Sequence, residues 1–132
     1  MAMQVLEKNR LIEATIRLSE TSPYGQFKLG ALIAQKNTII SMGVNQKKTH
    51  SLQKRFQRYD HLKPHLHAEI HAISLARTGD LEGSDIYVAR TMRSGGLGMS
   101  KPCIGCMEAL RHFGIRRMVY YCDGSFIRET IQ

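Results

Sequence analysis

Two short motifs that carry histidine, glutamate and cysteine side chains, far apart in the sequence, constrain the fold of this chain most. His67-Ala68-Glu69 opens one predicted helix, and Pro102-Cys103-Ile104-Gly105-Cys106 opens another. Cys103 and Cys106 are three residues apart, so a helix places both sulfurs on one face. The positive end of the helix dipole favours the thiolate forms of cysteines at such a position. A site that combines His67 with both thiolates requires the starts of the two helices to lie together.

These three side chains offer one imidazole and two thiolates, which are ligands that Zn²⁺ prefers. Three protein ligands leave the fourth tetrahedral position open, as in a catalytic site, and water bound there has its pKa lowered to about 7. A closed structural site would need a fourth ligand, for which Cys122 is the only thiol left. Cys122 falls inside a predicted strand, without ligand spacing. We therefore predict a catalytic zinc ion held by His67, Cys103 and Cys106.

Other motifs built from the same residue types fit less well. H-E-x-x-H zinc proteases have Glu directly after the first His, whereas Ala68 follows His67 here. We interpret His71, four residues after His67, as a core or rim histidine that can tune the site. A C-x-x-C pair alone is also typical of a structural zinc half-site or a redox pair. Its combination with H-x-E is the signature of zinc-dependent deaminases of nucleobases.

Length and composition limit the setting of this site. The chain has 132 residues, and we assign residues 1–132 to a single domain. The apolar share of 42% with 23% charged residues is that of a soluble globular protein. No stretch is long enough to span a membrane and the N-terminus does not resemble a signal peptide, so we expect a cytoplasmic protein. The net charge of +8 favours anionic partners, although it also suits solubility alone.

The predicted elements alternate between helices and strands. Helical spacing of apolar residues over 5–18 predicts a first helix. Strands over 27–34 and 38–44 form a hairpin that turns at Asn37. The second helix begins at Leu66 and ends near Thr78-Gly79-Asp80, a strand covers 85–90, and a glycine-rich, flexible loop covers 92–101. The third helix runs over 103–113, with Pro102 in its first turn and Gly114 as its C-terminal cap.

The last two strands are predicted over 117–122 and 126–130, joined by Asp123-Gly124. This turn leaves no room for a helix between the strands, so they must be antiparallel. The order α-β-β-α-β-α-β-β describes an α/β domain in which one mixed sheet is flanked by helices.

A basic segment over 45–64 lies between Asn45 and the helix that begins near His67. It is nearly devoid of aliphatic residues, and we predict a long functional loop there. Its cations are expected to mark the anionic part of the substrate: Lys47, Lys48, Lys54, Arg55 and Arg58.

In these motifs the chain resembles the cytidine and deoxycytidylate deaminase superfamily, most closely its small phage-type and bacterial members. The resemblance covers nearly the whole chain and implies a three-layer α-β-α fold with a five-stranded sheet. It places His67 at the helix entrance, where the turn is not yet regular, and makes Glu69 the catalytic proton shuttle. A family Gly-x-Asn element matches Gly43-Val44-Asn45. The resemblance thus implies that Asn45 contacts the substrate sugar or base and that Ala68 offers a backbone contact to the base.

The subgroup is less clear from the motifs. Many deoxycytidylate deaminases have Asn where this chain has His71, and free cytidine deaminases usually have Cys where it has His67. Adenine-acting tRNA deaminases share both metal motifs. An antiparallel final strand pair is found in the nucleoside-acting and bacterial toxin-type branches.

Three functions therefore remain in competition. The first is hydrolytic deamination of cytosine to uracil in a nucleoside or small nucleotide such as CMP or dCMP, with Lys47 or Lys48 meeting a phosphate. The second is deamination of cytosine or adenine in single-stranded nucleic acid, which the charge favours but which only Phe56 and Tyr59 would support by stacking. The third is a noncatalytic, zinc-stabilised binding module, against which the presence of Glu69 argues. The sequence leaves a homo-oligomer open.

Overall fold

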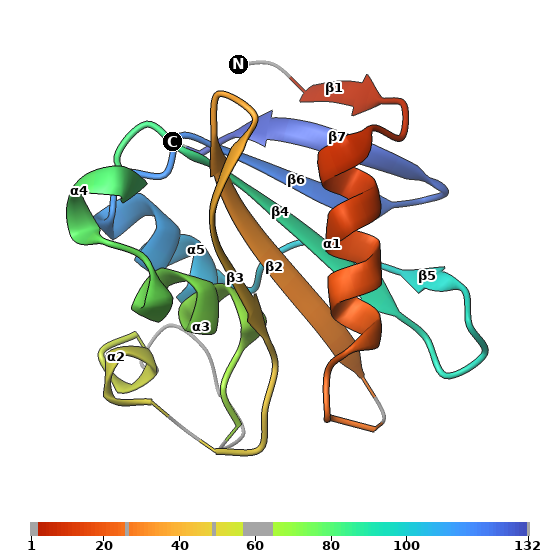
Figure 1. Ribbon diagram of the computed structural model, residues 1–132, viewed down its shortest axis with the longest axis horizontal. Helices are drawn as coiled ribbons and strands as arrows, with labels where there is room; N and C mark the ends of the chain where they lie inside the picture. The colour runs from red at the N-terminus through yellow and green to blue at the C-terminus, as the bar shows by residue number, and fades with distance from the viewer. Residues whose placement is uncertain (1–2, 26, 49, 57–64, 132) are drawn as a thin grey trace.

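The computed structural model describes residues 3–25, 27–48, 50–56 and 65–131. The elements follow one another (Figure 1) in the order β1 (Met3–Leu6), α1 (Arg10–Glu20), β2 (Lys28–Gln35), β3 (Thr38–Val44), α2 (Ser51–Lys54), α3 (Ala68–Leu75), α4 (Thr78–Leu81), β4 (Asp85–Thr91), β5 (Leu97–Gly98), α5 (Ile104–His112), β6 (Arg117–Cys122) and β7 (Ser125–Thr130). The eight elements predicted from the sequence are present, but the first helix begins at Arg10 and the second ends at Leu75, before the expected end near Thr78-Gly79-Asp80. The sequence did not predict β1, α2, α4 and β5.

The strands of the described residues form one mixed sheet in the order β1-β7-β6-β4-β2-β3, with β5 paired to β4 beside this path. The β4–β6 pair is parallel, and the other pairs are antiparallel. The expectation of five strands is wrong, because β1 and β5 bring the number to seven. The final two strands are antiparallel as predicted, in a register from Arg117↔Thr130 to Cys122↔Ser125.

The N-terminal segment corrects the predicted first helix, which was expected from residue 5. Asn9 is the N-cap of α1, and its side chain accepts a hydrogen bond from the backbone N–H of Ile12 at 3.0 Å. This cap starts the helix at Arg10. Val5, in contrast, belongs to β1 and pairs with Ile127 of β7. Val5 and its neighbours therefore form a strand because they pair with the edge of β7, although their spacing alone suggested a helix.

Two tight turns agree with the prediction and set the register of the hairpins. Lys36 and Asn37, between β2 and β3, have φ of 49° and 67°. Asp123 and Gly124, between β6 and β7, have φ of 50° and 85°. Positive φ at both central residues is the type I′ geometry that matches the twist of paired strands. Gly114, with φ of 79°, follows α5 as the predicted cap.

Alternation along the central strands gives the sheet two apolar faces. Ile33 of β2 and Val88 of β4 are fully buried in a cluster with α3 and α5. Leu32 and Tyr87, one position away on the same strands, pack in a second cluster with Ile12 of α1. Burial of each such large side chain stabilises the fold by about 1.5–3 kcal/mol. Helices thus cover both faces of the sheet, which gives three layers (Figure 1).

The two segments that were expected to be loops contain regular structure. In the predicted loop over 92–101, β5 pairs with β4, and the backbone N–H of Met92 donates to Gly96 O at 2.7 Å. The basic segment contains the short helix α2, and Gln46 forms an isolated antiparallel bridge with Leu66. Arg58 and Tyr59 lie outside the described residues.

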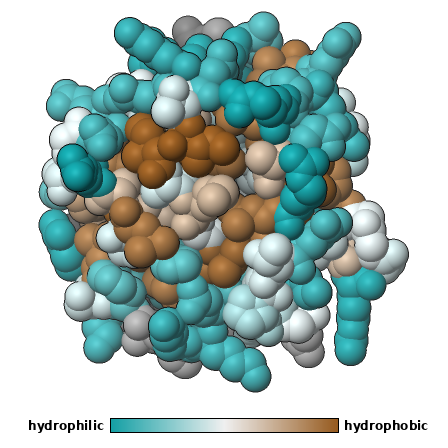
Figure 2. Space-filling model, viewed as in Figure 1, coloured by the Kyte–Doolittle hydropathy of each residue, from teal (hydrophilic) through white to brown (hydrophobic). Residues whose placement is uncertain are grey.

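The strand β3 forms one edge of the sheet. Ile39 and Met42 of this strand are 37% and 47% exposed. Figure 2 shows hydrophobic side chains gathered in the region that β3 occupies in Figure 1, surrounded by hydrophilic ones. None of the helices in the described residues has the length and apolar character that a bilayer crossing requires.

Candidate metal centre and its cavity

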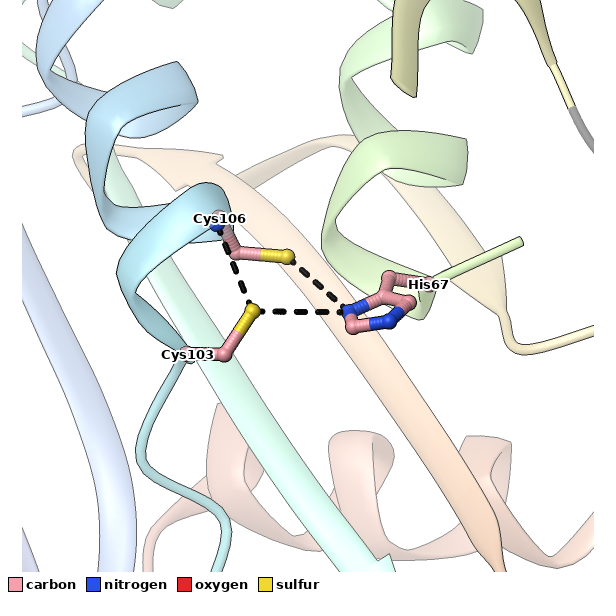
Figure 3. Close-up of side chains that lie close together, drawn as sticks. All are labelled: His67, Cys103 and Cys106. Atoms are coloured by element: carbon pink, nitrogen blue, oxygen red, sulfur yellow. Dashed lines mark hydrogen bonds between the residues drawn. The ribbon is translucent and has the colours of Figure 1, made fainter. Parts of the chain in front are cut away.

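His67, Cys103 and Cys106 come together at the starts of α3 and α5, as predicted. The Nδ1 atom of His67 lies 3.7 Å from the Sγ of Cys103 and 3.2 Å from the Sγ of Cys106. Figure 3 shows this nitrogen directed at both sulfurs, with the imidazole and the thiols contributed by different helices. In the described part of the chain, these residues are the one group of three or more metal-ligating side chains with their ligand atoms within 4.8 Å of one another.

The donor set and its spacing fit a zinc ion. With a Zn–N distance of about 2.0–2.1 Å and a Zn–S distance of about 2.3 Å, tetrahedral nitrogen and sulfur ligands stand about 3.6 Å apart. The two observed N–S distances, 3.2 and 3.7 Å, bracket this value. An imidazole and two thiolates are positioned to bind the metal with little movement, and they leave a fourth position for another ligand.

Local helix geometry explains how these residues face one another. His67 is the N-cap of α3, with φ of −76° and ψ of 145°, so its side chain leaves the chain before the regular helix begins. Cys103 is the N-cap of α5, and its sulfur accepts a hydrogen bond from the backbone N–H of Cys106 at 3.5 Å. Helix N-termini stabilise negative charge, which favours thiolates at this place. The predicted irregular entrance at His67 is present.

Gln53 holds the chain in front of His67, a role that sequence reasoning missed. Its side chain is buried and donates to His65 O at 2.6 Å, while its Oε1 accepts from the backbone N–H of His67 at 2.7 Å. The ring of His65 stacks on that of His67, with centroids 5.0 Å apart. The short helix α2, which carries Gln53, therefore fixes the backbone that presents the first metal ligand.

Glu69 lies in the first turn of α3 and is 4% exposed. Burial raises the pKa of its carboxyl above the ordinary value, while His67 and Cys106 nearby act in the opposite direction. A carboxyl that gains a proton more readily than usual is suited to proton transfer. The spacing of His67 and Glu69 works as expected, because only Glu69 is inside the regular helix.

A cavity of about 300 Å³ opens beside the metal ligands. This volume is at the lower end of the range for small-molecule sites. The cavity is lined by Phe27, Leu29, Asn45, His65, His67, Ala68, Glu69, Arg90, Met99, Ser100, Lys101 and Cys103. The predicted site residues Asn45, Ala68 and Glu69 are thus brought together with the metal ligands. Lys47 and Lys48 are exposed and are not part of this lining.

Asn45 directly follows β3, is buried, and forms three hydrogen bonds with its side chain. Its Oδ1 accepts from Ser22 Oγ at 2.5 Å and from the backbone N–H of Leu29 at 3.0 Å. Its Nδ2 donates to Phe27 O at 2.6 Å. An amide nitrogen carries two hydrogens. These contacts fix the side chain against the cavity wall and use one of its two N–H groups.

Gly43 and His71 explain how β3 approaches α3. A Cβ atom on Gly43 would lie 2.4 Å from the backbone nitrogen of Ala72 and 2.8 Å from the carbonyl oxygen of Ala68. Only glycine permits this close approach. His71 accepts a hydrogen bond at Nδ1 from the backbone N–H of Val44 at 3.0 Å, and burial lowers its pKa. The histidine is therefore a partner of β3 rather than a metal ligand, consistent with the sequence interpretation.

Two cations that sequence reasoning missed line the cavity. Arg90 is at the end of β4, with its guanidinium 4.7 Å from the ring centroid of Phe27. Lys101, two residues before Cys103, lies 3.7 Å from a carboxylate oxygen of Glu129, which also accepts from Tyr120 OH at 2.7 Å. Lys101 thus has a carboxylate partner. The position of Arg90 on a short strand gave no signal in the sequence.

Comparison with known families identifies the group to which this arrangement belongs. Residues 6–122 match the family described as the cytidine and deoxycytidylate deaminase zinc-binding region. The chain belongs to this family. The matched range includes the three candidate metal ligands, Glu69 and the Gly43-Val44-Asn45 element. The sequence prediction of the family is confirmed, and so is the presence of a zinc-binding region. No curated protein sequence matches this deaminase-family chain significantly.

The dCMP deaminase among the similar solved structures agrees with this chain at the level of the fold. The dCMP deaminase of cyanophage S-TIM5, in its apo form, is 18% identical, with a TM-score of 0.53 over 85% of this chain and 82% of that one. Two forms of Acinetobacter baumannii RibD are 20% and 19% identical, each with a TM-score of 0.48, over 82% and 81% of this chain. The deaminase-family chain spans only 26% and 25% of the RibD chains.

Proposed function

We propose that this protein catalyses the zinc-dependent hydrolytic deamination of a cytosine base to uracil in a nucleoside or small nucleotide. The observation that carries the proposal is the position of Glu69. This buried carboxyl lines the same small cavity as His67 and Cys103. A site that only stabilised the fold with zinc would have no use for a buried acid beside the metal ligands, where burial costs free energy.

Each residue around the cavity has a proposed part in the reaction. Bound zinc would supply a Lewis acid that lowers the pKa of a water molecule at its open position. Glu69 accepts one proton from water and delivers it to the ring nitrogen, where it stays. Glu69 then takes the second water proton from the hydroxyl group added to the ring and delivers it to the amino group. That group leaves as ammonia, and the water oxygen becomes the new carbonyl oxygen of the base.

Asn45 and Ala68 are proposed to hold the substrate. The second amide hydrogen of Asn45 is available to a sugar hydroxyl or to the base, because the described hydrogen bonds use only the first. The backbone N–H of Ala68 belongs to the first turn of α3, where amide groups have no acceptor within the helix. Both residues line the cavity.

Single-stranded nucleic acid is the second candidate substrate. Lys47, Lys48 and Lys54 are exposed on the segment between Asn45 and His67, and both of these residues line the cavity. A strand that delivered one base to the cavity would pass close to this segment. If a mononucleotide is the substrate, we propose that Lys47 and Lys48 instead attract it from outside the cavity by their charge.

The test is ammonia release from CMP, dCMP, cytidine, adenosine and a cytosine-containing oligonucleotide, each with zinc-loaded protein. We expect turnover of a cytosine mononucleotide or nucleoside, and Glu69→Gln should lower kcat by at least about 100-fold, because it removes the proton shuttle but no metal ligand. Zinc content and thermal unfolding of the variant should match those of the wild type. Unchanged turnover in Glu69→Gln would show that another group moves the proton.

The oligonucleotide arm separates the two candidates. Strand binding through several phosphates should weaken steeply with salt, with a logarithmic slope of about −0.7 per neutralised phosphate. A mononucleotide should show only mild salt dependence. Turnover of the oligonucleotide alone would overturn the proposal in favour of a nucleic acid deaminase.

A further inference from the structure

Arg90 occupies a position on β4 that should be apolar by the pattern of the strand. Alternate residues of β4 face the same side of the sheet. Ile86 and Val88 on this side are fully buried in the cluster with α3 and α5. Arg90 is the next residue on the same side, and it lines the cavity instead of extending the core. The strand therefore directs a cation toward the layer that contains the metal ligands.

Arg90 has no counter-charge among the described residues. The ion pairs of this part of the chain join Lys101, Arg111 and Arg117 to carboxylates and do not include Arg90. Its Nε atom is buried and has no hydrogen-bond partner there. The guanidinium is instead held over the face of Phe27. A partly buried cation without an anion is costly, so an anionic ligand in the cavity would complete its surroundings.

The contrast with Arg117 shows what a satisfied arginine looks like in the same sheet. Arg117 donates from Nε and Nη2 to the two carboxylate oxygens of Asp85, at 3.0 and 2.8 Å. This paired geometry is the one that guanidinium groups form with carboxylates and phosphates. Arg90, at the opposite end of the strand that carries Asp85, has the same potential without the partner.

The sheet places Arg90 opposite the proposed sugar or base contact. Leu29 of β2 pairs with Arg90 of β4. On the other side of Leu29, the backbone N–H of Asn45 donates to Leu29 O at 3.2 Å. Asn45, Leu29 and Arg90 therefore form one row across the sheet, and all three line the cavity. A substrate that contacts Asn45 near its sugar would extend toward Arg90.

We propose that Arg90 binds the phosphate group of a mononucleotide substrate and makes the enzyme prefer nucleotides to nucleosides. This inference rests on the proposed function for the location of the base, and it assigns a residue to the phosphate. Lys101 is the weaker candidate for this role because Glu129 already pairs with it.

The experiment measures binding rather than turnover. Isothermal titration calorimetry with zinc-loaded Glu69→Gln protein compares CMP with cytidine and AMP with adenosine, so that the phosphate is tested whatever the preferred base is. In this background, Arg90→Ala should raise the Kd of the nucleotide by about 10- to 100-fold and leave that of the nucleoside within about 2-fold. Arg90→Lys should lose less, because it keeps the charge but not the paired donors.

Controls separate a lost contact from a damaged fold. Arg93→Ala removes an exposed cation from the turn that follows β4 and should leave all Kd values unchanged. Arg90→Met keeps the length of the side chain without its charge and should reproduce the effect of Arg90→Ala. All three Arg90 variants must retain bound zinc and cooperative thermal unfolding.

Four other results of the binding measurements would overturn the inference. An equal rise in the Kd of nucleotide and nucleoside would show that Arg90 contacts the base or stabilises the pocket. An unchanged Kd for both would exclude Arg90 from substrate binding. If a cytosine oligonucleotide titrated in the same way is the only ligand whose binding weakens, Arg90 contacts a strand instead. If the parent protein binds no nucleotide, the inference also fails. Nucleotide binding that depends on Arg90 without ammonia release from wild-type protein would refute the proposed reaction alone.

Discussion

Replacement of Gly43 by Ala tests how closely the metal centre depends on the packing of β3 against α3. The new Cβ atom would lie 2.4 Å from the backbone nitrogen of Ala72, whereas ordinary contact begins at 3.4 Å. The strand and the helix must therefore separate by about 1 Å. The Ala72 nitrogen and the Ala68 carbonyl oxygen, which the new Cβ atom would meet, belong to the backbone of α3, so no side-chain rotation can relieve the overlap.

The cost has two parts. Overpacking of this kind costs about 1–3 kcal/mol. The hydrogen bond from Ser41 Oγ to Ala72 O, now 2.8 Å long, would lengthen beyond bonding distance and cost about 1 kcal/mol more. A total of about 2–4 kcal/mol corresponds to a fall in Tm of about 4 °C per kcal/mol for a chain of this size. A shift of α3 also moves His67 relative to the two sulfurs, so zinc affinity should fall about 10- to 100-fold.

The assay is thermal unfolding of the zinc-loaded protein together with competition for zinc by a chelator. Gly79→Ala is the matched control, because nothing lies within 4 Å of the Cβ position at Gly79 and the residue is in the short helix α4. The control should keep its zinc affinity and lose no stability. If Gly43→Ala changes Tm by less than about 2 °C and zinc affinity by less than about 2-fold, the close approach is not a constraint on the site.

Two further changes test the metal centre itself. Metal analysis should find about one zinc per chain. Cys106→Ala should abolish zinc binding because only two ligands remain, while Cys122→Ala should retain the zinc. Zinc in the Cys106 variant would refute the assigned ligand set. Gln53→Ala leaves His65 O and the His67 N–H without their buried partner, so the unfolding free energy should fall by about 1–3 kcal/mol and zinc affinity should weaken. Lys54→Ala, exposed on the same short helix, should change neither quantity, and an equal effect of both variants would assign the loss to α2 as a whole.

The sequence predicted the parts of the fold that depend on local chemistry. Asp123-Gly124 required positive φ angles and so fixed the antiparallel end of the sheet. The ligands at His67 and Cys103 were recognisable because their helix starts combine residue type with spacing. The match to the family confirms a zinc-binding region, and His67, Cys103 and Cys106 are positioned to bind a metal ion.

The remaining features depend on contacts between distant segments. Val5 lies in a strand only because β7 offers an open edge more than 100 residues later. Gln53 has an ordinary polar neighbourhood in the sequence, and its two bonds arise only when α2 packs against the chain before α3. Arg90 follows a buried strand pattern that gives no indication of a cavity at its end. The assignment of Lys47 and Lys48 to the substrate stays a prediction.

The metal ligands lie before and after β4 in the sequence, and this order has a consequence for folding. His67 precedes this strand and Cys103 follows it, so their native arrangement requires β4 in the sheet and both helices docked on the same face. Closing such a loop costs entropy that later contacts must recover. A chain whose two helices have not yet docked therefore does not offer zinc all three ligands in their native arrangement. Zinc would then bind at full affinity only in the last steps of folding, and the rate of zinc binding would report the rate of those steps.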